Sequence, residues 1–77
     1  MNKQKRTSLK KAASYLSLAA DIIQDVKYEE EDSLRNLPEN LENSERYENM
    51  EKAVDCLDDA LSSIQEAESC VSEAINC

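Results

Sequence analysis

The carboxy-terminal third of this chain repeats every seven residues, and this repeat limits the possible folds more than any other feature. Residues 53–77 divide into AVDCLDD, ALSSIQE, AESCVSE and AINC, each beginning with alanine. Apolar side chains recur within these units at Val54, Leu57, Leu61, Ile64, Val71 and Ile75. A strict heptad keeps an apolar strip facing a partner helix and is typical of left-handed supercoils. The repeat therefore predicts a long helix packed lengthwise against another helix.

A second apolar strip occupies the first half of the chain. It consists of Leu9, Ala12, Leu16, Ala19, Ile23 and Val26, at spacings of three and four. Thr7 or Ser8 can act as the N-cap. Pro38 would clash inside a helix, and the residue before a proline is pushed out of the helical region. We therefore expect a first helix over about residues 7–36.

The two strips are separated by LPENLENSE, a segment rich in turn-forming residues. We expect a turn over 37–43, to which Pro38, Asn40 and Asn43 contribute, and a second helix over about 44–76 with Ser44 as its N-cap. A short connection makes the helices antiparallel neighbours. The fold class is thus all-α, an antiparallel two-helix hairpin that forms one domain over residues 1–77. Its core seam would contain Leu16, Ile23, Val54, Leu57, Leu61, Ile64 and Val71.

The expected register pairs residues whose numbers add to about 80. It places Val26 opposite Val54, and Glu68 near Lys10 and Lys11. The same register places Glu30 within reach of Arg46. Glu68 and Glu30, the two carboxylates in the seam, would then each lie close to a cation.

The apolar strip of residues 53–77 is wider than one partner helix can cover. Alanines and the Cys and Ser residues flank the seam, so the strip covers about 150° of the helix, more than a two-helix seam needs. A chain of 77 residues also buries little apolar surface by itself. We therefore expect a homodimer or higher oligomer, with two hairpins forming a four-helix bundle.

Composition excludes most chemistry. The chain has no His and no Gly, so it lacks a general base of the usual kind and a glycine-rich phosphate loop. Cys56, Cys70 and Cys77 are too far apart along one helix to form a disulfide with one another, and they lack the spacing of a zinc site. We expect a non-enzymatic protein without metal or cofactor. No apolar run is long enough to cross a bilayer, which predicts a cytoplasmic protein.

Charge is distributed unevenly. Residues 1–11 contain five of the nine cations and no acid, whereas all seventeen acids lie in residues 12–77. The acidic body makes direct binding to nucleic acid or to anionic membranes unfavourable. Candidate anion-binding residues are Lys3, Arg6, Lys10 and Lys11, which alternatively cover the acidic part of their own hairpin. An acidic ridge on the second helix is the candidate partner-binding surface and consists of Glu45, Glu48, Glu51, Asp55, Asp58, Asp59 and Glu66.

Residues 34–75 resemble a group of short, acidic, uncharacterised helical-hairpin proteins of bacteriophages and bacterial mobile elements. The most specific part of the resemblance is Leu37, Pro38, Glu39, Asn40, Leu41, Ser44 and Glu45. Residues 1–33 match only in character. The resemblance implies a charged first helix linked to a heptad-rich second one, inside a host bacterial cell. It brings no established activity and no functional residues.

These observations lead to one preferred function and two alternatives. The preferred function is an accessory protein that inhibits a host defence or nucleic-acid-handling protein by direct binding, with the acidic ridge imitating nucleic acid. The first alternative is an oligomeric sponge that sequesters a small anionic nucleotide messenger. The second is a structural coiled-coil subunit, for which the ridge only keeps the assembly soluble.

Overall fold

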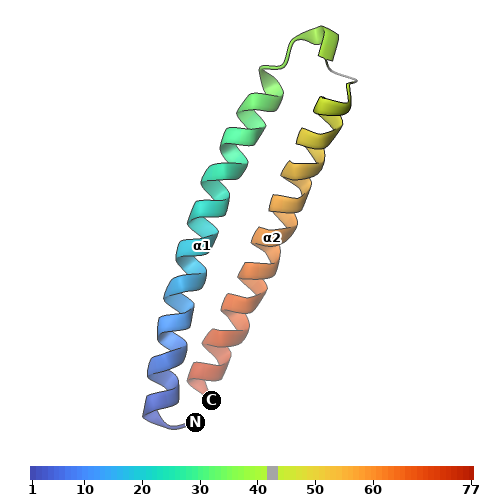
Figure 1. Cartoon of the computed structure of the whole chain (residues 1–77). Coiled ribbons are helices and arrows are strands. Elements are labelled where there is room, and N and C mark those ends of the chain that lie inside the picture. Colours follow the sequence, from blue (N-terminus) through green and yellow to red (C-terminus); the bar gives the residue numbers. More distant parts are fainter. Residues whose placement is uncertain (42–43) are drawn as a thin grey trace.

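The chain forms two long helices that lie side by side. The computed structural model describes residues 1–41 and 44–77, in which helix α1 (Lys3–Arg35) is followed by a short 3-10 helix, η1 (Glu39–Leu41), and by helix α2 (Glu45–Asn76). The two helices run antiparallel, and the chain ends meet at one end of the rod (Figure 1). The rod measures 59 × 14 × 13 Å. The all-α hairpin expected from the two apolar strips is therefore confirmed.

Helix α1 begins four residues before the predicted start. Asn2 is its N-cap, with an extended backbone and a side-chain oxygen that accepts a hydrogen bond of 2.8 Å from the Lys5 N–H. The Thr7 hydroxyl instead donates to the Lys3 carbonyl oxygen, inside the helix. The predicted N-cap at Thr7 or Ser8 was wrong because the apolar spacing starts only at Leu9. Lys, Gln and Arg extend a helix readily without contributing to an apolar strip.

The connection between the helices ends α1 and begins α2 with different hydrogen bonds. At the end of α1, the Asn36 N–H donates to the Asp32 carbonyl oxygen over 3.1 Å. Pro38 begins the turn that follows, and its carbonyl oxygen accepts a hydrogen bond of 2.9 Å from the Leu41 N–H. Ser44 is the N-cap of α2, as predicted, and its Oγ accepts from the Tyr47 N–H. Residues 42 and 43 of the predicted turn, including Asn43, lie outside the described residues.

The seam between the helices consists of partly buried side chains. No residue in the described part of the chain is fully buried, because each helix has a neighbour on one side only. The predicted seam residues are all partly buried: Leu16, Ile23, Val54, Leu57, Leu61, Ile64 and Val71. Val26, which was expected to face Val54, is 45% exposed. The pairing of Val26 with Val54 was therefore wrong.

Lys27 occupies the seam position that Val26 was expected to fill. Its ammonium group lies 2.5 Å from Asp58 on α2, and its side chain is 18% exposed. At the ends of the rod, an Arg6 Nη2 group donates to the Cys77 carbonyl oxygen over 3.0 Å. These two contacts join residues whose numbers add to 85 and 83, so the register lies within about one helical turn of the predicted one.

Candidate interaction surfaces

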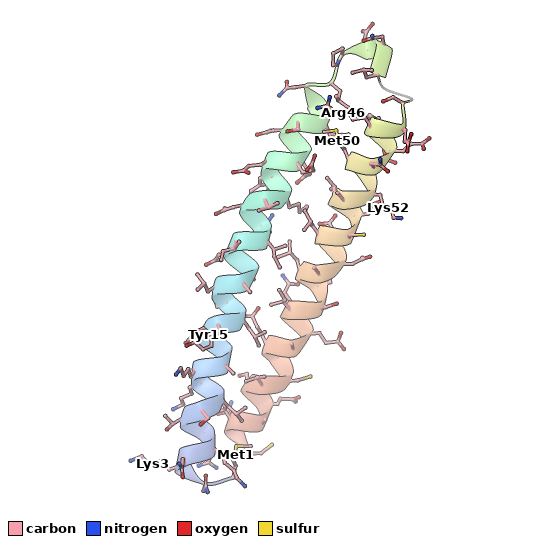
Figure 2. All side chains as sticks on the ribbon, in the orientation of Figure 1. Met1, Lys3, Tyr15, Arg46, Met50 and Lys52 are labelled. Atoms are coloured by element: carbon pink, nitrogen blue, oxygen red, sulfur yellow. The ribbon has the colours of Figure 1, made fainter. Side chains whose placement is uncertain are left out.

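The acidic ridge follows the exposed surface of α2, and its residue Asp58 also reaches α1. Six of its carboxylates are exposed and make no ion pair within the described residues: Glu45, Glu48, Glu51, Asp55, Asp59 and Glu66. Glu45 and Glu48 lie in the first turn of α2, where the helix dipole favours negative charge. Lys52 is the cation that interrupts the ridge, and its side chain extends away from α1 (Figure 2). The ridge is therefore a row of solvated negative charge along α2, densest from Glu45 to Asp59.

Asp58 differs from the other ridge residues because it forms an ion pair with Lys27 of α1. Its hydrogen bond to Lys27 raises the pKa of that lysine above the ordinary 10.5. Partial burial of Lys27 opposes this change, while the charges of Asp58 and of Glu31, 4.0 Å away, reinforce it. Asp58 is thus structural, and substituting it would alter the hairpin as well as the ridge.

The candidate anion-binding residues do not converge on one point. Lys3, Arg6 and Lys10 are spaced three and four residues apart, so they share one side of α1. Lys11 lies on another side, with its ammonium group 5.9 Å from the centre of the Tyr15 ring. Arg6 is engaged with the Cys77 carbonyl oxygen, and its Nε is buried without a hydrogen-bond partner. The basic segment is therefore the first three turns of a helix rather than a loose arm.

Of the two carboxylates predicted in the seam, Glu68 does not pair with the predicted cations, whereas Glu30 lies near its predicted one. Glu68 is partly buried, yet the ion pairs within the described residues use only Lys27 and Arg35 as cations. Lys10 and Lys11 therefore do not pair with Glu68, and this expectation was wrong. Glu30 does lie near Arg46, because both line a shallow surface groove together with Met50. Figure 2 shows Arg46 and Met50 at the start of α2.

Four large apolar side chains form a surface that the sequence analysis did not single out. Tyr15, Leu18, Ile22 and Val26 are 61, 56, 56 and 45% exposed, and together they are called the outer strip here. Their spacing of three, four and four residues aligns them along α1. The Tyr15 side chain extends away from α2 (Figure 2). The spacing alone could have revealed this strip as a second face separate from the seam.

The remaining groups offer little site chemistry. The three cysteines are free and exposed. No cluster of three or more His, Cys, Asp or Glu side chains suited to a metal ion occurs in residues 1–41 and 44–77. Among these same residues, neither helix is apolar enough over a sufficient length to cross a membrane.

Comparisons with known proteins assign no family to this chain, so its classification is that of its fold, a helical hairpin. No family model matches it, and no match results from the curated proteins or from the solved structures.

Proposed function

We propose that this chain is a non-enzymatic accessory protein of a phage or mobile element that binds and inhibits a protein of the bacterial host. The contact surface is the acidic ridge, and the partner is a defence or nucleic-acid-handling protein whose basic groove accepts the ridge. The phage context comes from the sequence resemblance of residues 34–75. The observation that carries the proposal is the row of six exposed carboxylates along one helix, which form no ion pair within residues 1–41 and 44–77.

The spacing of these carboxylates supports mimicry of a phosphate backbone. From Glu45 to Glu66 the helix rises about 32 Å at 1.5 Å per residue. Six carboxylates over that length give about one negative charge per 5 Å of axis, and about one per 6 Å after Lys52 is subtracted. One strand of B-DNA carries a phosphate every 3.4 Å of axis. The ridge thus reaches more than half the linear charge density of a DNA strand.

Electrostatic attraction of this kind depends on salt and on the number of charges. A basic groove that neutralises the ridge would release bound counterions, so binding should weaken as the salt concentration rises. A single ridge carboxylate is solvated and contributes little. Several must therefore be neutralised together to test the proposal.

The test compares two variants with the same change in charge. The ridge variant carries Asp55→Asn, Asp59→Asn and Glu66→Gln, and omits Asp58 because of its bond to Lys27. The control variant neutralises three exposed acids elsewhere and carries Asp21→Asn, Asp25→Asn and Glu39→Gln. Immobilised wild-type protein is exposed to lysate of a bacterial host, and each captured protein is purified and assayed for nucleic-acid binding with and without the hairpin.

The proposal requires that wild type and control capture the same protein and displace nucleic acid from it, and that the ridge variant do neither. Capture that is equal for all three proteins, with unchanged helicity by circular dichroism, would exclude the ridge as the contact surface.

The sponge alternative receives no support from the arrangement of cations, because Lys11 lies apart from Lys3 and Lys10 and Arg6 is already engaged. Calorimetric titration with a panel of nucleotides separates it from the proposal. Saturable binding of one nucleotide would favour the sponge. The structural-subunit alternative predicts that the pull-down recovers only further copies of this chain.

A further inference from the structure

The outer strip lies on the same side of the hairpin as the alanines of α2. In an antiparallel helix pair, one side of the seam is flanked by the same heptad position from both helices. On α1 these positions are held by Ala12, Ala19 and Val26, next to the rest of the outer strip. On α2 they are held by Ala53, Ala60, Ala67 and Ala74. One face of the hairpin is therefore apolar across both helices, and small side chains on α2 permit close approach.

The hairpin as a whole exposes more surface than a compact protein of its mass. The hairpin exposes 5898 Å², whereas a compact monomer of 8.7 kDa would expose about 4,700 Å². The difference is about 1,200 Å² per chain. A standard interface buries about 800 Å² per partner. A second chain docked on the apolar face would therefore bring the exposed area close to that of a compact protein.

The outer strip is complementary to itself when it is reversed. Lys11 continues the strip at one end and Glu29 continues it at the other, and both are exposed. If two α1 helices cross antiparallel near residue 20, Lys11 of each chain meets Glu29 of the other and Leu18 meets Ile22. Tyr15 then lies next to Val26. Such reciprocal pairing is what a two-fold symmetric interface requires.

The charge of the whole rod favours the same orientation. The half near the chain ends, residues 1–20 and 64–77, has five cations and three acids, whereas residues 21–63 have four cations and fourteen acids. Two hairpins in the same direction would place the strongly acidic halves side by side. Reversing one hairpin places each acidic half against the weakly basic half of its partner, which lowers the electrostatic free energy.

We propose that a second copy of this chain docks on the apolar face in the reversed orientation, with the outer strips in contact and two Lys11–Glu29 pairs closing the interface. This arrangement specifies the four-helix bundle and rests on the self-association that the sequence predicted. It does not depend on the acidic ridge, because the ridge lies toward the opposite side of α2 and stays exposed. The dimer can therefore be tested separately from partner binding.

Sedimentation equilibrium in low salt tests the proposal. The wild-type chain should have twice its 8.7 kDa mass. Lys11→Glu and Glu29→Lys should each weaken the dimer about tenfold, because each creates two like-charged contacts per dimer. The double variant restores opposite charges at both contacts and should return the dissociation constant to within about threefold of wild type. These side chains are exposed, so the variants should keep their helicity.

Matched controls are Lys10→Glu and Asp21→Lys, which change the net charge equally on another side of α1. Their dissociation constants should stay within about threefold of wild type. A monomeric wild-type chain would overturn the proposal. A dimer whose double variant shows no recovery, or whose controls weaken it as much as the single variants do, would overturn the reversed orientation. The ridge variant should keep the dimer mass while losing partner binding, so failure of one proposal is distinguishable from failure of the other.

Discussion

The N-caps of the two helices should differ in their contribution to stability. The Ser44 hydroxyl accepts a hydrogen bond of 3.2 Å from the Tyr47 N–H and donates one of 2.6 Å to the Leu41 carbonyl oxygen. It therefore starts α2 and closes the turn with the same oxygen, in a partly buried place. The Asn2 side chain makes one hydrogen bond, at an exposed end of α1. We expect Ser44→Ala to cost more than Asn2→Ala.

The size of the difference follows from these contacts. Loss of an N-cap costs about 1 kcal/mol, and loss of the second hydrogen bond adds about 0.5 kcal/mol. Ser44→Ala should thus lower the free energy of unfolding by about 1.5 kcal/mol. Asn2→Ala should lower it by about 0.5 kcal/mol, because the first turn of α1 frays without unfolding the seam. With a urea m-value of about 1 kcal/mol/M for a small protein, the midpoints should fall by about 1.5 M and about 0.5 M.

Urea unfolding followed by circular dichroism at one chain concentration measures both values. Thr7→Ala and Ser8→Ala serve as controls, because neither residue caps α1 in the structure, and each should move the midpoint by less than about 0.5 M. Equal losses for Ser44→Ala and Asn2→Ala would refute the double role of Ser44. A larger loss for Thr7→Ala than for Asn2→Ala would refute the observed start of α1.

Two further predictions concern single groups in the seam and at its edge. The pKa of Lys27 is raised in the folded chain. The stability from its bond to Asp58 is therefore present below pH 10.5 and is lost as the pH rises through the raised pKa. Urea midpoints should fall more for wild type than for Lys27→Met between about pH 9.5 and about pH 11.5, and parallel curves would contradict this. Serine at Cys56, Cys70 or Cys77 should change the free energy of unfolding by less than about 0.5 kcal/mol, because Ser63 already occupies the equivalent heptad position and the three thiols are exposed; a larger loss in the same urea assay would assign a thiol a packing role.

The sequence predicted the hairpin because its strongest signals concern where helices begin, end and pack. The heptad of residues 53–77 requires a partner helix, Pro38 ends the first helix, and Ser44 begins the second. Pro38 and Ser44 act on the residues next to them, and the heptad persists over enough residues to exclude a strand or a loop. The start of α1 was missed because Asn2 caps a turn of cations and a glutamine, which has no apolar period.

The seam was harder to predict because the first helix carries two apolar strips. Val26 fits the spacing of either strip, and its greater hydrophobicity favoured it over Lys27 as a seam residue. The structure assigns Val26 to the outer strip, because the pair of Lys27 with Asp58 satisfies a seam position that an isolated lysine could not occupy. A spacing rule reads one helix at a time, whereas the choice between strips depends on the facing helix.

The two proposed surfaces place different demands on the same small molecule, and the hairpin separates them. An apolar face is stabilised when it is buried away from water, whereas a row of carboxylates must stay solvated unless a basic partner binds it. On α2 the alanines flank one side of the seam, while Asp55 lies toward the other side and Asp59 and Glu66 lie on the face opposite the seam. Covering the alanines with a second chain therefore leaves the carboxylates solvated. A reversed dimer then carries two ridges that run in opposite directions, so two partner molecules can bind one dimer without competing for either surface.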